Sequence, residues 1–179
     1  MEQLHLVSGT TGHQIYVVEN LTINYWHKPP TLRAYDMLEA ILRERSQRYA
    51  YGNALANVFT SWDTARTRLA PEVRDRIVAL ARNPAIPMRA VAQIIVTSGL
   101  LANLIGMAVS TLMLLTKRAT PVQVFKSTSV AAQWLFSYMP KERGAPVWNA
   151  PLIDNMLKAV IAQTASMHNA HPRSSENRV

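Results

Sequence analysis

Hydrophobic and polar residues change their spacing several times along the chain, and each change marks an expected element. Residues 14–20 are rich in β-branched and aromatic side chains, which predicts a strand. Residues 21–26 alternate apolar and polar side chains with a period of two and predict a second strand with one wet face. Because Glu19 and Asn20 can turn the chain, we expect the two strands to form a hairpin that Pro29 and Pro30 end.

Two later stretches carry apolar residues three and four positions apart, as on one face of a helix. Thr31 is placed as the N-cap of the first helix, and Pro71 suits the first turn of the second. Residues 54–60, between them, predict a mostly buried strand. The two expected core stripes are Leu32, Tyr35, Leu38, Ile41 and Leu42, then Val73, Ile77, Leu80 and Ala81.

The apolar run over residues 90–115 allows two interpretations. Its length is close to that of a membrane span, and Arg89 and Lys117 flank it. Polar residues such as Gln93 and Asn103 interrupt it, and the surrounding alternation of strands and helices needs two pieces there. We therefore expect a central strand over residues 89–97 and a helix from residue 98 or 99 to 115, with contact to lipid left open as the alternative.

The last third of the chain predicts a short strand and two helices. Residues 121–125 form the strand, and Ser127, Thr128 and Ser129 can cap the helix that follows. We expect that helix to bury Val130, Trp134 and Leu135. The final helix starts near Pro151, and its stripe consists of Leu152, Ile153, Met156, Leu157, Val160 and Ile161.

The order of these elements predicts an α/β fold with a single mixed β-sheet. An N-terminal hairpin comes first, a βαβαβα order with covering helices follows, and one extra C-terminal helix ends the chain. We expect one α/β domain over residues 1–140 and an amphipathic helix over 141–167 that packs on the domain or on a partner. Residues 168–179 are polar and are expected to form a disordered tail.

Residues 121–135 read Pro-Val-Gln-Val-Phe-Lys-Ser-Thr-Ser-Val-Ala-Ala-Gln-Trp-Leu. This segment and the order of elements resemble the STAS-like (anti-sigma-factor-antagonist-like) domains over roughly residues 15–135. The resemblance implies that the chain is a regulatory module, which binds another protein in a bacterial-type signalling pathway. It also implies that the chain is not an enzyme. Typical members carry a phosphorylatable serine in an Asp-x-Ser-Gly turn. The equivalent residues 58–63, Val-Phe-Thr-Ser-Trp-Asp, depart from that pattern, because the aspartate follows the hydroxyls.

Composition narrows the possible chemistry. The chain has no cysteine, which excludes disulfides, thiolate catalysis and cysteine-ligated metal centres and suits a cytoplasmic setting. The five histidines show no metal-ligand pairing, and no phosphate-binding glycine motif occurs among six glycines. We therefore expect no catalytic residues, no metal and no cofactor.

The loop after the buried strand at 54–60 is the first candidate for partner binding or phosphorylation. It follows the carboxyl end of a strand, where ligands commonly meet open α/β sheets, and a phosphate there would lie near two arginines. The competing interpretation is a turn whose side chains bond their own backbone. The candidate residues are Thr60, Ser61, Trp62, Asp63, Arg66 and Arg68.

The final helix is the second candidate surface, because its apolar stripe needs a cover. It either packs on its own sheet, which we favour, or forms a homodimer contact. The interface candidates are Trp148, Leu152, Met156 and Val160.

Two other functions remain as alternatives to protein binding. The first is a lipid or apolar small-ligand carrier with a pocket between helices and sheet. The second is a basic nucleic-acid-binding protein, suggested by the net charge of +8. Acidic and basic residues alternate at Arg43-Glu44-Arg45, which favours a solvated helix face over a nucleic-acid surface.

Overall fold

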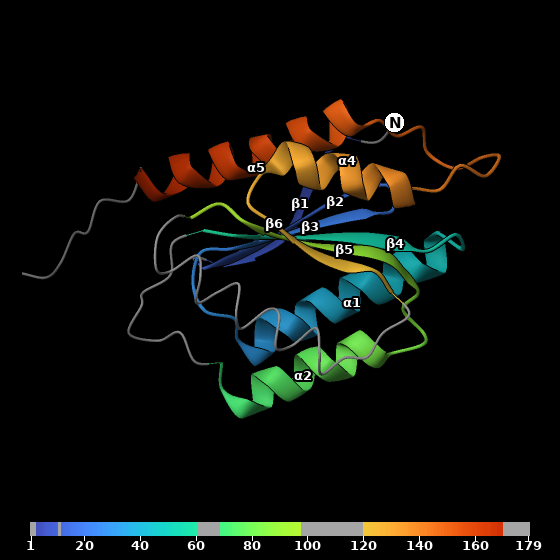
Figure 1. Ribbon diagram of the computed structural model, residues 1–179. Helices are drawn as coiled ribbons and strands as arrows, with labels where there is room; N and C mark the ends of the chain where they lie inside the picture. The colour runs from blue at the N-terminus through green and yellow to red at the C-terminus, as the bar shows by residue number, and fades with distance from the viewer. Residues whose placement is uncertain (1–2, 11, 61–68, 98–119, 170–179) are drawn as a thin grey trace, which may run out of the picture.

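The computed structural model describes residues 3–10, 12–60, 69–97 and 120–169, and these form a sheet between two layers of helices (Figure 1). The strands are β1 (His5–Thr10), β2 (His13–Val18), β3 (Leu21–Trp26), β4 (Asn53–Phe59), β5 (Met88–Ile95) and β6 (Val122–Phe125). The helices are α1 (Leu32–Arg48), α2 (Pro71–Arg82), α4 (Thr128–Tyr138) and α5 (Ala150–Asn169).

The six strands lie in the sheet in the order in which they occur in the chain. β1 pairs with β2, and β2 with β3, in antiparallel fashion, whereas β3, β4, β5 and β6 run parallel. This is the mixed α/β sheet that the sequence predicts. Parallel neighbours need crossover connections, and α1 and α2 supply the crossovers from β3 to β4 and from β4 to β5.

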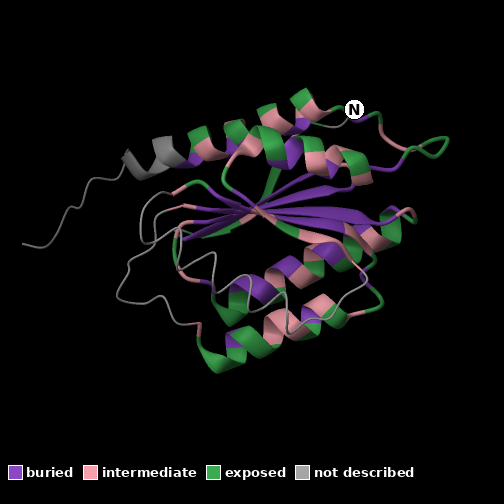
Figure 2. Ribbon diagram, in the orientation of Figure 1, coloured by how far each residue is buried: buried purple, intermediate pink, exposed green. Residues whose placement is uncertain are grey.

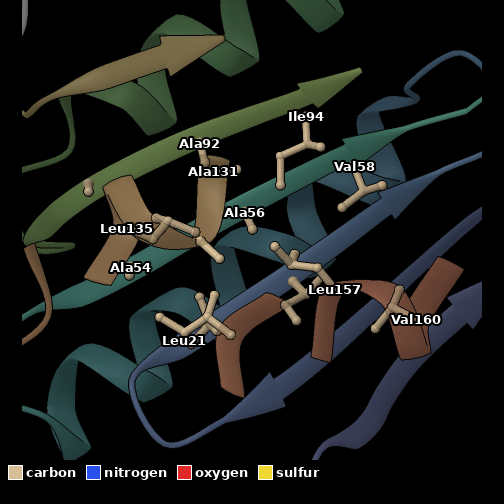
Figure 3. Packing of buried hydrophobic residues seen from close by; sticks show 14 of the residues in the cluster. Leu21, Ala54, Ala56, Val58, Ala92, Ile94, Ala131, Leu135, Leu157 and Val160 are labelled. Atoms are coloured by element: carbon tan, nitrogen blue, oxygen red, sulfur yellow. The ribbon is translucent and has the colours of Figure 1, made fainter. Parts of the chain in front are cut away.

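Each face of the sheet packs against its own helical layer. α1 and α2 cover one face, α4 and α5 cover the other, and strands β2 to β4 are buried along their whole length (Figure 2). Under α4 the central strands carry small side chains, among them Ala54, Ala56 and Ala92, so the helix can approach the sheet closely (Figure 3). Leu135 of α4 and Leu157 of α5 are fully buried on this face.

Local signals in the sequence explain where the helices begin. The side-chain oxygen of Thr31 accepts a hydrogen bond from the backbone N–H of Ala34 at 3.3 Å, which caps α1 as predicted. Pro71 occupies the first turn of α2, where a missing N–H costs nothing. Glu19, with φ of 47°, takes the left-handed conformation that closes the predicted β2–β3 hairpin.

Two differences from the sequence prediction concern the elements. Strand β1 was not expected, because its side chains are mostly exposed and show no alternation. Val130 is 52% exposed and does not belong to the core of α4, which buries Ala131 and Ala132 instead. The strand predicted over residues 89–97 is confirmed as β5, so the run over residues 90–115 is not one continuous helix; the helix expected after residue 98 lies outside the described residues.

Candidate functional site

The predicted loop after β4 is only partly visible in the structure. Thr60 lies at the carboxyl edge of the sheet, whereas Ser61, Trp62, Asp63, Arg66 and Arg68 lie outside the described residues. The Thr60 hydroxyl donates to the backbone carbonyl of Trp26 at 3.1 Å and lies 3.3 Å from Nδ1 of His27. Thr60 therefore ties the end of β4 to the end of β3, and its hydroxyl hydrogen is already engaged.

A row of polar side chains crosses the sheet on the face that α1 and α2 cover. Asn24 of β3, Asn57 of β4 and Gln93 of β5 are direct neighbours in register. Asn24 is fully buried and donates through Nδ2 to Oδ1 of Asn57 at 2.8 Å. Its own Oδ1 accepts a hydrogen bond from Nε2 of His13 on β2. We call His13, Asn24, Asn57 and Gln93 the polar row.

The hydrogen bonds of the polar row fix the tautomer of His13. Because the amide oxygen of Asn24 can only accept, the imidazole hydrogen is on Nε2, and Nδ1 has no hydrogen-bond partner among the described residues. The ring stacks on Trp26 with 4.1 Å between ring centroids. Burial lowers the pKa of His13, while the bond to Asn24 works in the opposite direction. The row is thus neutral, and its hydrogen bonds join β2, β3 and β4 inside the molecule.

The interface candidates around α5 lie mostly inside the chain's own core. Val160 is fully buried, and Trp148 is 6% exposed and donates from its indole nitrogen to Oδ1 of Asn20 at 3.1 Å. Leu152 and Met156 are half-buried against the same core. α5 packs on α4 and on the sheet, so Trp148 and Val160 are not available on the surface of this chain.

A partly exposed aromatic cluster lies along the flank of α4 next to the edge strand β6. The rings of Phe125 and Trp134 lie 5.3 Å apart, and those of Trp134 and Tyr138 lie 4.9 Å apart, each pair tilted. Trp134 and Tyr138 are half-buried, and Val130, one helical turn before Trp134, is 52% exposed. We call Phe125, Trp134 and Tyr138 the aromatic ladder.

Arg89 holds the C-terminal end of the aromatic ladder in place. Its Nε donates to the backbone carbonyl of Tyr138 at 2.7 Å, and its Nη1 donates to the carbonyl of Tyr51 at 2.9 Å. The same guanidinium lies 3.3 Å from the carboxylate of Glu142. Hydrogen bonding by its own backbone N–H, followed by the charge of Arg89, lowers the pKa of the Glu142 carboxyl. The end of α4 is therefore fixed to β5 and to the loop before β4.

Basic side chains flank the aromatic ladder at both ends of α4. Lys126 precedes the helix, Lys141 and Arg143 follow it, and all three are exposed. Sequence reasoning placed Val130 and Trp134 in the core and gave the flank no role. The available signal was the spacing of Val130, Trp134 and Tyr138, which recurs every four residues beside the small buried residues.

Within the residues that the structure describes, no three histidine, aspartate or glutamate side chains gather closely enough to hold a metal ion. Among the same residues, no helix combines the length and the apolar character needed to cross a membrane. Comparisons with models of protein families, with curated proteins and with solved structures found no match.

Proposed function

We propose that this chain is a non-enzymatic regulatory module that binds another protein through the flank formed by α4 and β6. The observation that carries this proposal is the aromatic ladder, with Val130 exposed beside it. Trp and Tyr side chains dominate the binding energy of many protein interfaces, because they contribute a large contact area with few rotatable bonds.

The ladder suits an interface because its members are already ordered before binding. Trp134 packs between Phe125 and Tyr138, and Arg89 binds the carbonyl of Tyr138. A partner would therefore meet side chains that lose little conformational freedom on association. Val130 offers the most accessible apolar contact of the flank.

Charge indicates what kind of protein would bind there. Lys126 follows Phe125 directly, Lys141 and Arg143 follow the end of α4, all three are exposed, and the whole chain carries a net charge of +8. An acidic partner surface would be attracted to this flank and would associate faster at low salt. We therefore propose that the partner covers the apolar flank and places its acidic groups around that contact.

The resemblance to STAS-like domains supports the regulatory part of the proposal. The segment that carries the resemblance, residues 121–135, also supplies β6, Phe125, Val130 and Trp134. A signalling role of STAS-like type would thus use the unit of the fold in which the likeness is found.

The test compares two single substitutions that add the same charge. Val130→Asp places a carboxylate in the proposed contact, and Asn155→Asp places one on an exposed position of α5. Tagged wild-type protein and both variants would be used to capture partners from the source cells, and the retained protein would then be purified and titrated. We expect the affinity to fall at least about tenfold for Val130→Asp, since a buried unpaired charge costs several kcal/mol.

The control variant Asn155→Asp should bind like wild type. Equal affinity of the two variants would refute a contact at Val130. Melting curves of both variants must match that of wild type, because only then does a loss of binding report on the surface.

A further inference from the structure

β1 is an end strand of the sheet, and its outer edge is free of any other described strand. It pairs with β2 through residues from His5 to Thr10, and the sheet order continues only in the direction of β3. The backbone groups on the outer edge of such a strand are open to pairing with another strand.

The composition of β1 lacks the usual protection against pairing. The strand reads His-Leu-Val-Ser-Gly-Thr and contains no lysine, arginine, aspartate, glutamate or proline. Leu6 is 50% exposed and Val7 is 47% exposed. The opposite edge strand, β6, has only four residues and is followed by Lys126, so it is both shorter and next to a charge.

The pairing of β1 with β2 is irregular at one residue. Leu6 pairs with Tyr16 and Ser8 with Ile15, so Val7 is an extra residue without an opposite partner. A bulge of this kind often turns an edge away from other chains. Here the bulged residue, Val7, is itself apolar and half-exposed.

We propose that a second copy of this chain pairs with β1, strand against strand and antiparallel across a two-fold axis. The charge distribution argues for this occupant. An acidic partner would be drawn to the lysines and arginines that give the chain its charge of +8, whereas β1 carries no charged residue. An identical strand offers equal length and the same uncharged composition, and a two-fold axis makes the contact self-complementary.

The expected dimer dissociates on dilution. A six-residue strand pair with two exposed apolar side chains on each copy lies below the size of standard permanent interfaces, which bury about 1,200–2,000 Å². The repulsion between two chains of charge +8 weakens the dimer further at low salt. Association should therefore rise with protein concentration and with ionic strength.

Sedimentation velocity of the full chain over a concentration series tests the proposal. Wild type should shift from its monomer mass of 20.0 kDa towards twice that mass as concentration rises. Val7→Lys should remain monomeric, because it places like charges beside each other across the axis. Val130→Lys adds the same charge at a valine of similar exposure on α4 and should dimerise like wild type.

A charge-reversal experiment separates strand pairing from a loss of folding. Val7→Glu alone should also be monomeric, and an equal mixture of Val7→Lys and Val7→Glu should restore the dimer through opposite charges across the strands. A monomeric wild type at all concentrations, a dimeric Val7→Lys variant, or a mixture of folded variants that stays monomeric would each overturn the inference.

The two proposals fail separately. Val7→Lys should keep the affinity for the captured protein partner, and Val130→Asp should keep the dimer. Loss of the dimer in Val130→Asp would show that the α4 flank, and not β1, holds the two copies together.

Discussion

The contact between Trp148 and Asn20 gives the most direct test of how the C-terminal part of the chain is attached. Trp148 precedes α5 and donates to Oδ1 of Asn20 at 3.1 Å, and Asn20 lies in the β2–β3 turn and is fully buried. Through Nδ2, Asn20 also donates to the carbonyl of Gly52 at 3.1 Å. One amide thus joins the hairpin, the start of β4 and the segment that leads into α5.

Replacing Trp148 by Phe should lower the free energy of unfolding by about 2–4 kcal/mol. The buried oxygen of Asn20 would lose its donor, which costs about 1–3 kcal/mol because no water can replace it easily. The smaller ring would also leave a cavity, which should lower stability by about 1 kcal/mol more. For a chain of this size, each kcal/mol lowers the melting temperature by about 2–4 °C.

The assay is urea unfolding followed by far-ultraviolet circular dichroism, since tryptophan fluorescence would change with the substitution itself. Trp134→Phe is the matched control. It removes the same atoms from a half-buried side chain whose indole nitrogen has no hydrogen bond to any described residue. We expect that control to cost about 1 kcal/mol.

The comparison between the two variants decides the outcome. If Trp148→Phe costs no more than Trp134→Phe, the buried hydrogen bond contributes no net stability. The attachment of α5 would then depend on apolar packing alone. The claim that Oδ1 of Asn20 is costly to leave without a donor would be refuted.

Three further predictions concern the core, His13 and Arg89. Leu157→Ala should cost about 2–5 kcal/mol in urea unfolding, because Leu157 is fully buried, whereas Asn155→Ala on the exposed side of α5 should change stability by less than about 0.5 kcal/mol. Burial lowers the pKa of His13 below its unfolded value near 6.5, so the unfolded chain binds the proton first and stability should fall as the pH drops below 6.5. His13→Gln should remove this part of the pH dependence. If the urea midpoint of the variant falls with pH as steeply as that of wild type, the prediction is wrong. Arg89→Ala should cost about 1–3 kcal/mol in thermal unfolding, because the carbonyls of Tyr138 and Tyr51 lose their donors. A variant that melts at the wild-type temperature would show that these two hydrogen bonds contribute no net stability.

Most elements could be predicted because runs of β-branched and aromatic residues mark the strands, and apolar residues three and four positions apart mark the helices. The hairpin, the capped helix from Thr31 and the strand over residues 54–60 lie within about two residues of their predicted positions. The wet face predicted for residues 21–26 is wrong, because β3 is buried along its whole length between the two helical layers. β1 could not be predicted on this basis, because an edge strand with both faces largely exposed has no reason to alternate. Its pairing with β2 depends on backbone hydrogen bonds, which leave no pattern in the side chains.

The polar row shows why a buried site was missed. In the sequence, Asn24, Asn57 and Gln93 are three single polar residues in three separate strands. Only the register of the parallel strands brings them side by side, and that register is set by the crossover helices and not by a local pattern. α4 was misjudged for a related reason: its close approach to alanines of the sheet selects the small Ala131 and Ala132 for burial and turns Val130 outward.

The sheet order gives the two proposed surfaces a fixed relation. β1 and β6 are the first and last strands of the sheet, so β1 and the flank of α4 beside β6 lie at opposite ends of it. Pairing of two copies through β1 would join their sheets and leave both aromatic ladders at the outer ends. Each copy could then bind a partner without displacing the other copy. A dimer with two such surfaces binds a multivalent partner more tightly than the monomer does. A monomeric Val7→Lys variant should therefore lose apparent affinity for an immobilised, densely presented partner while its affinity for a partner in solution stays unchanged. Equal losses in both formats would show that β1 itself belongs to the partner-binding surface.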